Sequence, residues 1–514
     1  MGLWTIYFFA KLYLYYRGFI RFDVLMNFLF LAFLILPIPK PYREARLAAM
    51  AKQAAAAIIA LALLWHDSWL PDPLYAVRML QQNGMPSREY LYQFLLRLLS
   101  LKELAVLAGI GILSFLIRNY RKTAAVGTAV LLLLPLVVGS EETGRRSAAD
   151  LERYVGSFFN AESTRRIQAA PPAAGSRDFD ILILQICSLA WDDLREVGRE
   201  NDPFFKQFDL LFTDFNTVTT YSNPAALRLL NGNCGQRRHA DLYTSLSRDC
   251  SLMEGLHSQG FAVRFARNHN GAYGKFDEEV RRFGHLEAAP FVPSGLEAKK
   301  YMFDDSPVYD DYDLLAQWWA GRRRSGEKKV ALYYNSVSLH DGSHWINDRE
   351  WWKRDHREQY GEFLRTLLAD LSRFFETLAA SDRNVVVVVM GEHGRAVRGN
   401  AIETPGLRDI PLPRITIVPV GIKLFGAAKG SGSGRSTVIG KPTSYFGLSS
   451  VLEAFGEHDP FSTDRYATRA FINSVPQTNF VAENENNLVV KMDDEYYFFG
   501  KDRKWVYLSR EALK

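Results

Sequence analysis

Polar residues follow three apolar segments whose composition is typical of buried strands. They are Cys187 after segment 179–186, His340 after segment 329–336, and Glu392 with His393 after the valines at 385–389. Short, uninterrupted apolar runs of this kind are typical of parallel strands covered on both faces. Ligands bind beyond the carboxyl ends of such strands. We therefore expect these side chains to lie at one edge of a sheet.

The residue types predict a metal centre. Thiolate, carboxylate and imidazole are ligands of zinc, and a catalytic zinc site keeps one position open. Considered singly, Cys187 is more simply interpreted as a core thiol, and His340 and His344 as loop residues on the surface. Because three separate strands converge, we expect a Zn²⁺ site among Cys187, His340, Glu392 and His393.

A fourth segment, Tyr221-Ser222-Asn223-Pro224, has the form of a helix start. Proline is favoured in the first helical turn, and Ser222 or Asn223 is then an ordinary N-cap residue. The alternative is that Ser222 is a nucleophile. Backbone N–H groups at a helix start attract phosphate, and a metal-bound serine oxygen is more acidic.

The elements that must position these residues indicate an α/β fold. Long amphipathic patterns such as residues 352–380 lie between the strand segments. This order predicts a mostly parallel sheet with helices on both faces. The tail, residues 487–509, alternates and breaks at Gly500, which predicts short antiparallel strands at the sheet edge or on a face.

The first 140 residues are strongly apolar and predict a bundle of about five transmembrane helices. The predicted spans are residues 5–20, 24–38, 48–64, 102–117 and 124–138. Repeated apolar segments exclude a single cleaved signal peptide. Basic residues gather in the second and fourth connections, at 40–52 and 118–122, and should lie in the cytoplasm. The part after Gly139 is then on the outer side, which is the periplasm if the cell has two membranes.

The 514 residues are too many for one core and predict separate units. We expect a transmembrane domain at 1–140, a membrane-exit helix and linker at 141–178, and a catalytic domain at 179–514. The net charge of +5 is spread along the chain without a long basic block, so nucleic-acid binding is not predicted.

The three cysteines bear on the compartment. Cys234 and Cys250 close a short loop, and outside the cytoplasm such a pair can oxidise. Cys187 then stays unpaired, as a metal ligand must. If Cys187 were in the disulfide instead, the metal site would lose a ligand.

Five motifs together resemble a known family. They are "ICSLAWDDL", "TYSNPAALRLL", "NCGQ", "LHDG" and "EHG". This set resembles the cellulose phosphoethanolamine transferases of bacterial cellulose-secretion systems, which belong to the alkaline phosphatase superfamily. The resemblance covers essentially the whole chain, and it implies an alkaline-phosphatase-like α/β/α domain. It also implies that Cys187, Ser222, Glu392 and His393 form the zinc site, with Ser222 as the nucleophile.

The resemblance assigns roles to further residues. It implies that His340 helps bind phosphate or relays protons, and that Tyr221 and Arg408 contact the substrate. It implies a disulfide between Cys234 and Cys250. It also implies association with subunits of a cellulose synthase complex.

The reaction that the resemblance implies has two steps. Ser222 takes phosphoethanolamine from phosphatidylethanolamine, and a glucosyl 6-hydroxyl of cellulose then accepts it. The alternatives are a phosphoethanolamine transferase or phosphodiesterase of the same fold acting on lipid A or another glycan, and a non-catalytic membrane scaffold of a cellulose synthase complex. A sulfatase is disfavoured, because Ala226 stands where the sulfatase motif has arginine.

Overall fold

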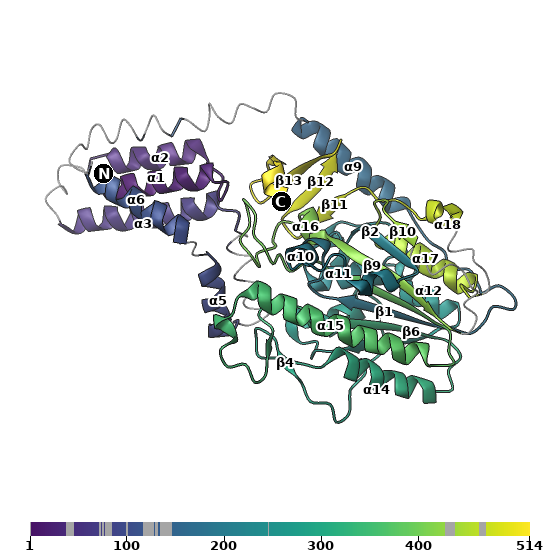
Figure 1. Ribbon diagram of the computed structural model, residues 1–514. Coiled ribbons are helices and arrows are strands. Elements are labelled where there is room, and N and C mark those ends of the chain that lie inside the picture. Colours follow the sequence, from purple (N-terminus) through teal and green to yellow (C-terminus); the bar gives the residue numbers. More distant parts are fainter. Residues whose placement is uncertain are drawn as a thin grey trace.

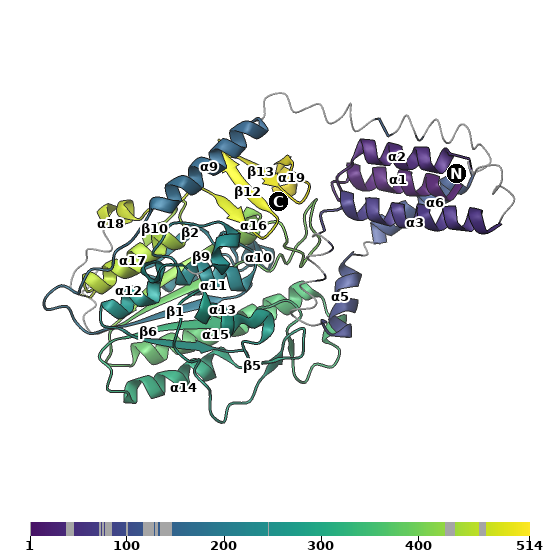
Figure 2. The same cartoon turned by 180° about the vertical axis from the view of Figure 1, so that it is seen from behind.

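A computed structural model describes residues 2–37, 46–70, 73, 77, 85–98, 101–116, 128, 132–133, 146–244, 246–426, 437–461 and 469–513. Figures 1 and 2 show a bundle of N-terminal helices beside a larger α/β domain. The short helix α5 lies between the bundle and that domain.

The α/β domain is built on a seven-stranded sheet in the order β10-β2-β9-β8-β1-β6-β3. Its strands are β1 (Asp180–Ile186), β2 (Leu210–Asn216), β3 (Ala262–Arg267), β6 (Val330–Ser336), β8 (Val385–Gly391), β9 (Ile417–Phe425) and β10 (Thr437–Ile439). Only β9 among the described strands of this sheet runs antiparallel to its neighbours, β2 and β8. The predicted mostly parallel sheet is confirmed.

The register of the central strands aligns their carboxyl ends. Ile186 at the end of β1 pairs with Ser336 of β6 and with Gly391 of β8. The residue after each strand therefore emerges at the same level of the sheet, and this alignment positions the functional residues.

Helices cover both faces of the sheet. They are α10 (Trp191–Glu196), α11 (Ser222–Leu230), α12 (Leu252–Ser258), α13 (Phe276–Arg282), α14 (Asp311–Arg324), α15 (His356–Ala379), α16 (Pro413–Thr416), α17 (Tyr445–Glu457) and α18 (Arg469–Ser474). The last helix, α19 (Arg510–Leu513), instead contacts the carboxyl-terminal sheet. Alternate side chains of a strand point to opposite faces. Val386 and Val388 thus pack in the core with α11, α12 and α17, while Val385, Val387 and Val389 pack with α14 and α15. Each buried valine contributes about 1.5–3 kcal/mol, which explains the apolar run of β8.

The carboxyl tail forms a separate antiparallel sheet, in agreement with the predicted strand type. Its strands are β11 (Val481–Glu483), β12 (Leu488–Met492), β13 (Glu495–Phe499) and β14 (Trp505–Leu508). This sheet packs on α9 (Ala148–Thr164) through an apolar cluster that includes Leu151 and Val490. A small third sheet consists of β4 (Lys300–Tyr301), β5 (Pro307–Val308) and β7 (His344–Trp345).

The prediction of about five membrane spans is wrong for the described residues. The N-terminal helices are α1 (Gly2–Tyr16), α2 (Val24–Ile35), α3 (Arg46–Asp67), α5 (Arg88–Leu98) and α6 (Leu101–Leu116). A membrane span needs about 20 residues. Among the described helices only α3, with 22 residues, is long and apolar enough, because the other apolar segments form helices of 12 to 16 residues. The predicted span at 124–138 lies almost wholly outside the described residues.

A buried ion pair ties the N-terminal helices together. Lys11 Nζ of α1 lies 2.9 Å from Asp67 Oδ2 at the end of α3, and both side chains are 1% exposed. Asn27 of α2 accepts a hydrogen bond from Lys11 and donates one to Asp67. This network explains why a lysine stands within an apolar segment.

The structure contains a disulfide between Cys234 and Cys250. Cys187 is free and buried. The pairing therefore leaves the predicted metal ligand available.

Candidate metal and nucleophile site

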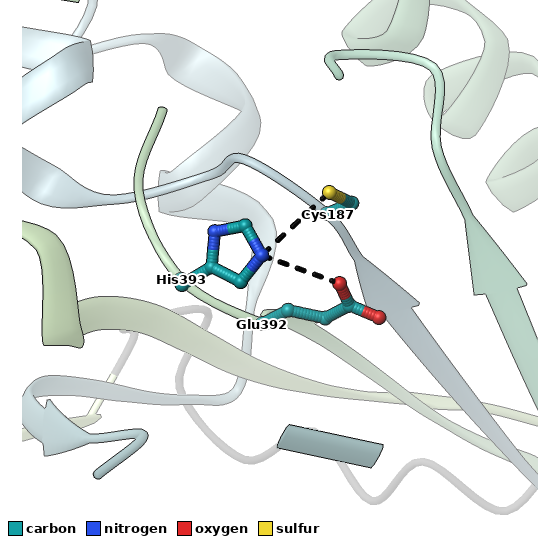
Figure 3. Close-up of side chains that lie close together, drawn as sticks. All are labelled: Cys187, Glu392 and His393. Carbon is teal, nitrogen blue, oxygen red and sulfur yellow. Dashed lines mark hydrogen bonds and ion pairs between the residues drawn. The ribbon is translucent and has the colours of Figure 1, made fainter. Parts of the chain in front are cut away.

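The ends of β1 and β8 bring Cys187, Glu392 and His393 together, and all three side chains are fully buried. Their candidate ligand atoms lie within 4.8 Å of one another (Figure 3). His393 Nε2 is 3.8 Å from Cys187 Sγ and 3.8 Å from Glu392 Oε2. A tetrahedral zinc ion holds a thiolate sulfur and an imidazole nitrogen about 3.6 Å apart. The spacing therefore suits such an ion.

Ser222 faces this cluster and does not cap its helix. The N-cap residue of α11 is Tyr221, and no side chain caps the helix there. Ser222 Oγ donates to Cys187 Sγ at 3.5 Å and lies 3.4 Å from His393 Nε2. Asn223 also does not cap the helix, because its amide donates to Gly274 O and to Glu279 Oε2. The amino end of α11 therefore presents a hydroxyl to the candidate metal ligands.

The backbone sets the tautomer of His393. Its Nδ1–H donates to Gly394 O at 2.9 Å, so the lone pair of Nε2 points toward Cys187 and Ser222. Burial and the positive charge of Arg408 hold the pKa of His393 well below its usual range. A neutral imidazole with a free Nε2 is the form that binds a metal ion.

Glu392 and Cys187 fit a cation at this place. Asn335 donates to Glu392 Oε1 at 2.5 Å, but among the described residues none makes a hydrogen bond of normal geometry to the buried Oε2 atom. Burial raises the pKa of Glu392 to about 7 and that of the Cys187 thiol to about 12. An unpartnered carboxylate oxygen, a thiol and an imidazole lone pair in one buried space are the donor set that a zinc ion satisfies.

The loops that carry these ligands are fixed by buried hydrogen bonds. Ser188, directly after Cys187, has a φ of 63°, a conformation that costs energy in a residue with a side chain. Tyr360 of α15 donates to its carbonyl at 3.1 Å. Asp193 of α10 accepts from the backbone N–H of Arg395 and from that of Val397, at 2.6 and 2.8 Å. Both ligand loops are therefore held from the α10 and α15 side of the sheet.

Arg408 lies at the site and Tyr221 beside it. Arg408 Nη1 is 3.4 Å from His393 Nδ1 and donates to Ser188 Oγ at 3.4 Å. The Tyr221 hydroxyl donates to Asp409 Oδ1 at 3.3 Å, which turns it toward the neighbour of Arg408. A half-buried guanidinium at this position can attract an anionic substrate.

His340 is near the cluster without a described hydrogen bond to its ligands. Its Nδ1–H donates to Asp341 O at 2.8 Å, and its ring stacks on Phe303 with centroids 5.1 Å apart. Burial and Arg408 lower the pKa of His340 to about 4, so the ring is a neutral acceptor at Nε2. His344 stacks on Trp351 instead and is separate from the cluster.

Asn335, Asp341 and Arg395 are not among the site residues predicted from the sequence. Asn335 had a usable signal, because it is a polar residue within an otherwise apolar strand segment. Asp341 accepts from Arg395 at 2.7 Å, and this contact joins loops that are far apart in the sequence. No local pattern predicts such a pair.

Comparison with known proteins gives one family for the whole chain. Residues 4–136 match the family model described as the N-terminal domain of cellulose biosynthesis protein BcsG, and residues 138–505 match the model of its C-terminal domain. Cellulose biosynthesis protein BcsG of Escherichia coli K12 is 31% identical over 545 residues, covering 98% of this chain and 95% of that protein. The Salmonella typhimurium LT2 protein of the same name is 31% identical over 546 residues, with the same coverage.

Solved structures are more distant. A protein in the alkaline phosphatase superfamily from Vibrio parahaemolyticus has a TM-score of 0.48 and 13% identity, covering 72% of this chain and 90% of that chain. Lipooligosaccharide phosphoethanolamine transferase A from Neisseria meningitidis has a TM-score of 0.40 and 12% identity, covering 84% of this chain and 95% of that chain.

Proposed function

The chain belongs to the family of cellulose biosynthesis protein BcsG, and on this premise we propose that it transfers phosphoethanolamine from phosphatidylethanolamine to glucosyl 6-hydroxyls of cellulose. The observation that carries the proposal is the position of Ser222. Its Oγ atom lies 3.5 Å from Cys187 Sγ and 3.4 Å from His393 Nε2, at the uncapped start of a helix.

The first step forms a covalent phosphoethanolamine-serine. Ser222 Oγ attacks the phosphorus of the lipid, the bond between phosphorus and the diacylglycerol oxygen breaks, and diacylglycerol leaves with a proton. The N–H groups at the start of α11 and the Arg408 guanidinium face the negative charge of the phosphoryl oxygens. The chain's own residues thus bind the group that is transferred.

A zinc ion fits the donor set of Cys187, Glu392 and His393. When bound, it supplies positive charge that lowers the pKa of the Ser222 hydroxyl and offsets charge on the phosphoryl group. Asn335 and the Gly394 carbonyl hold Glu392 and His393 for this role. Mutation of a residue that holds a metal ligand in this way typically lowers metal affinity by about 10- to 100-fold.

The second step returns the serine. The 6-hydroxyl of a glucosyl unit attacks phosphorus, the bond to Ser222 Oγ breaks, and the hydroxyl proton passes to a base. His340 suits that role, because its Nδ1–H is engaged by Asp341 O and its Nε2 is a neutral acceptor. No nucleotide is consumed, which suits the periplasm.

The donor explains why such a domain carries a membrane anchor. Helix α3 is long and apolar enough to cross a bilayer, in which phosphatidylethanolamine resides. We place the protein in the bacterial inner membrane with the α/β domain in the periplasm, beside the subunits of a cellulose synthase complex.

The test is transfer by the full-length chain in vesicles that contain phosphatidylethanolamine and lipid A, with a soluble cello-oligosaccharide as acceptor. Mass spectrometry of the sugar should show phosphoethanolamine, and Ser222→Ala or a zinc chelator should abolish it. Ser251→Ala is the matched control, because Ser251 is an ordinary N-cap that accepts from Glu254 N. Modified lipid A with unmodified sugar would assign another acceptor. Absence of bound metal and of any transfer would favour a scaffold.

A further inference from the structure

Helix α5 turns a polar face toward the α/β domain. Tyr90, Gln93 and Arg97 follow the spacing of one helix face, and Gln93 is buried. On the other faces Tyr92 and Leu95 are 51% and 55% exposed. Amphipathic helices of soluble domains bury their apolar face. In α5 the polar face is buried instead, which indicates that its polar side chains have a specific role.

That polar face ends on one carboxylate. Asp341 Oδ2 accepts from Arg97 Nη1 at 2.8 Å and from the Tyr90 hydroxyl at 2.9 Å. Asp341 Oδ1 accepts from Arg395 Nη2 at 2.7 Å. The side chains of Arg97, Asp341 and Arg395 are at most 5% exposed. Charge-assisted hydrogen bonds in such a buried place are strong and fix the geometry of the groups.

Asp341 contacts His340 directly, and the Tyr90 ring contacts it through Phe303. The backbone carbonyl of Asp341 accepts from His340 Nδ1 at 2.8 Å. The Tyr90 ring packs on Phe303 with centroids 5.6 Å apart, and Phe303 stacks on His340. Gly342 has a φ of 77°, and a Cβ atom there would meet the Tyr90 ring at 2.5 Å. The loop at 340–342 is thus shaped to receive α5.

We propose that Arg97 and Tyr90 are positioning residues of the transferase: through Asp341 and Phe303 they orient His340 for the step in which the acceptor hydroxyl attacks. This inference rests on the proposed function. Helix α5 stands between α3 and α6 in the sequence. The segment that joins the apolar helices thereby completes the environment of the acceptor step. Tyr90 and Arg97 make no described hydrogen bond to Ser222 or to the candidate metal ligands.

The experiment separates the two half-reactions of the full-length chain. Arg97→Met and Tyr90→Phe are mixed with phosphatidylethanolamine vesicles, and formation of the Ser222 adduct is followed by intact mass. Cello-oligosaccharide is then added and loss of the adduct is followed. We expect adduct formation at the parent rate, discharge slowed by up to about 100-fold, and unchanged bound zinc. Arg88→Met, at an exposed arginine of the same helix, should behave as the parent.

A double variant tests whether Arg97 and Asp341 act through their shared ion pair. Arg97→Met combined with Asp341→Asn should discharge no more slowly than the slower single variant, since both remove the same ion pair. The inference is overturned if both α5 variants discharge at the parent rate. It is also overturned if they slow both steps and lose zinc, which would indicate a merely structural role. A parent that never forms the adduct would instead overturn the proposed function itself.

Discussion

Two ligands of the candidate metal site, His393 and Glu392, are each held by a neighbour that determines which atom faces the site. Gly394 O fixes the His393 tautomer, and Asn335 occupies one oxygen of Glu392 and leaves the other free. Ser222 turns away from the capping role that its sequence position suggests. These hydrogen bonds and the orientation of Ser222 together produce a donor set for a cation.

Metal uptake is expected to release protons. Burial raises the pKa of Cys187 to about 12 and that of Glu392 to about 7, whereas the pKa of His393 lies well below its usual range. Near neutral pH the thiol is therefore protonated, the carboxyl is partly protonated and the imidazole is neutral. Zinc must displace these protons, so its affinity should rise by at least about tenfold per pH unit from about pH 6 to 8. Zinc competition titrations at several pH values measure this slope. A flat dependence would refute the ligand set.

Removing the partner of Glu392 should weaken the metal site without unfolding it. Asn335→Ala deletes the donor to Glu392 Oε1, and we expect zinc affinity to fall by about 10- to 100-fold. Asn231→Ala is the matched control, because Asn231 is also buried but donates to Leu227 O and Phe283 O. Chelator competition distinguishes the two variants. Equal affinities would show that Asn335 does not orient the ligand.

Strand β8 needs a glycine at its end to deliver Glu392 and His393. A Cβ atom on Gly391 would lie 2.0 Å from Leu189 O and 2.9 Å from Val418 Cβ. One neighbour is a backbone atom and the other belongs to a buried side chain, so neither can move away easily. The close approach at this position also brings Cys187 and Glu392 to the same level.

Gly391→Ala should therefore lower both stability and metal content. We expect the free energy of unfolding to fall by about 1–3 kcal/mol, the usual cost of overpacking a core. The control is Gly440→Ala, where a Cβ atom meets only Thr213 Oγ1 at 3.7 Å. Denaturant unfolding of the full chain in detergent measures the stability of both variants. A Gly391→Ala midpoint equal to that of the control would contradict the packing described.

Local sequence patterns predicted the strands that carry the site, but they could not predict contacts between residues far apart in the sequence. The predicted strands at 179–186 and 329–336 are observed at Asp180–Ile186 and Val330–Ser336, because continuous apolar runs specify buried strands. The antiparallel direction of β9 depends on tertiary packing. Arg97 and Asp341 are 244 residues apart in the sequence, so no local pattern could pair them. The apolar segments near the start predicted helices correctly, but not all of their bounds: α3 is longer than the predicted segment 48–64, whereas α2 ends at Ile35, short of the predicted residue 38.

The described residues form an N-terminal helical bundle and the α/β domain, and α5 contacts the loop beside the site. Within the bundle, the Lys11–Asp67 pair links the first helix to the single described candidate span. A buried charge without its partner is costly. The pair therefore reports whether the bundle has the described packing.

Lys11→Met should destabilise the full-length protein by about 3–5 kcal/mol, because it leaves the Asp67 carboxylate buried without its cation. The double variant Lys11→Met/Asp67→Asn removes the charge but keeps an acceptor for Asn27, so it should recover part of the loss. Thermal unfolding in detergent compares the two proteins. If the single variant were as stable as the parent, the buried pair would not exist in the folded chain.

Ser222 is the residue that we propose carries the transferred group. The most direct measurement is the intact mass of the full-length, zinc-loaded chain after brief exposure to phosphatidylethanolamine vesicles, followed by mapping of the modified peptide. We expect the added mass of one phosphoethanolamine group on the peptide with Ser222, and we expect it to be absent from Ser222→Ala and after chelation. An unmodified parent, or the same adduct on the Ser222→Ala variant, would contradict it.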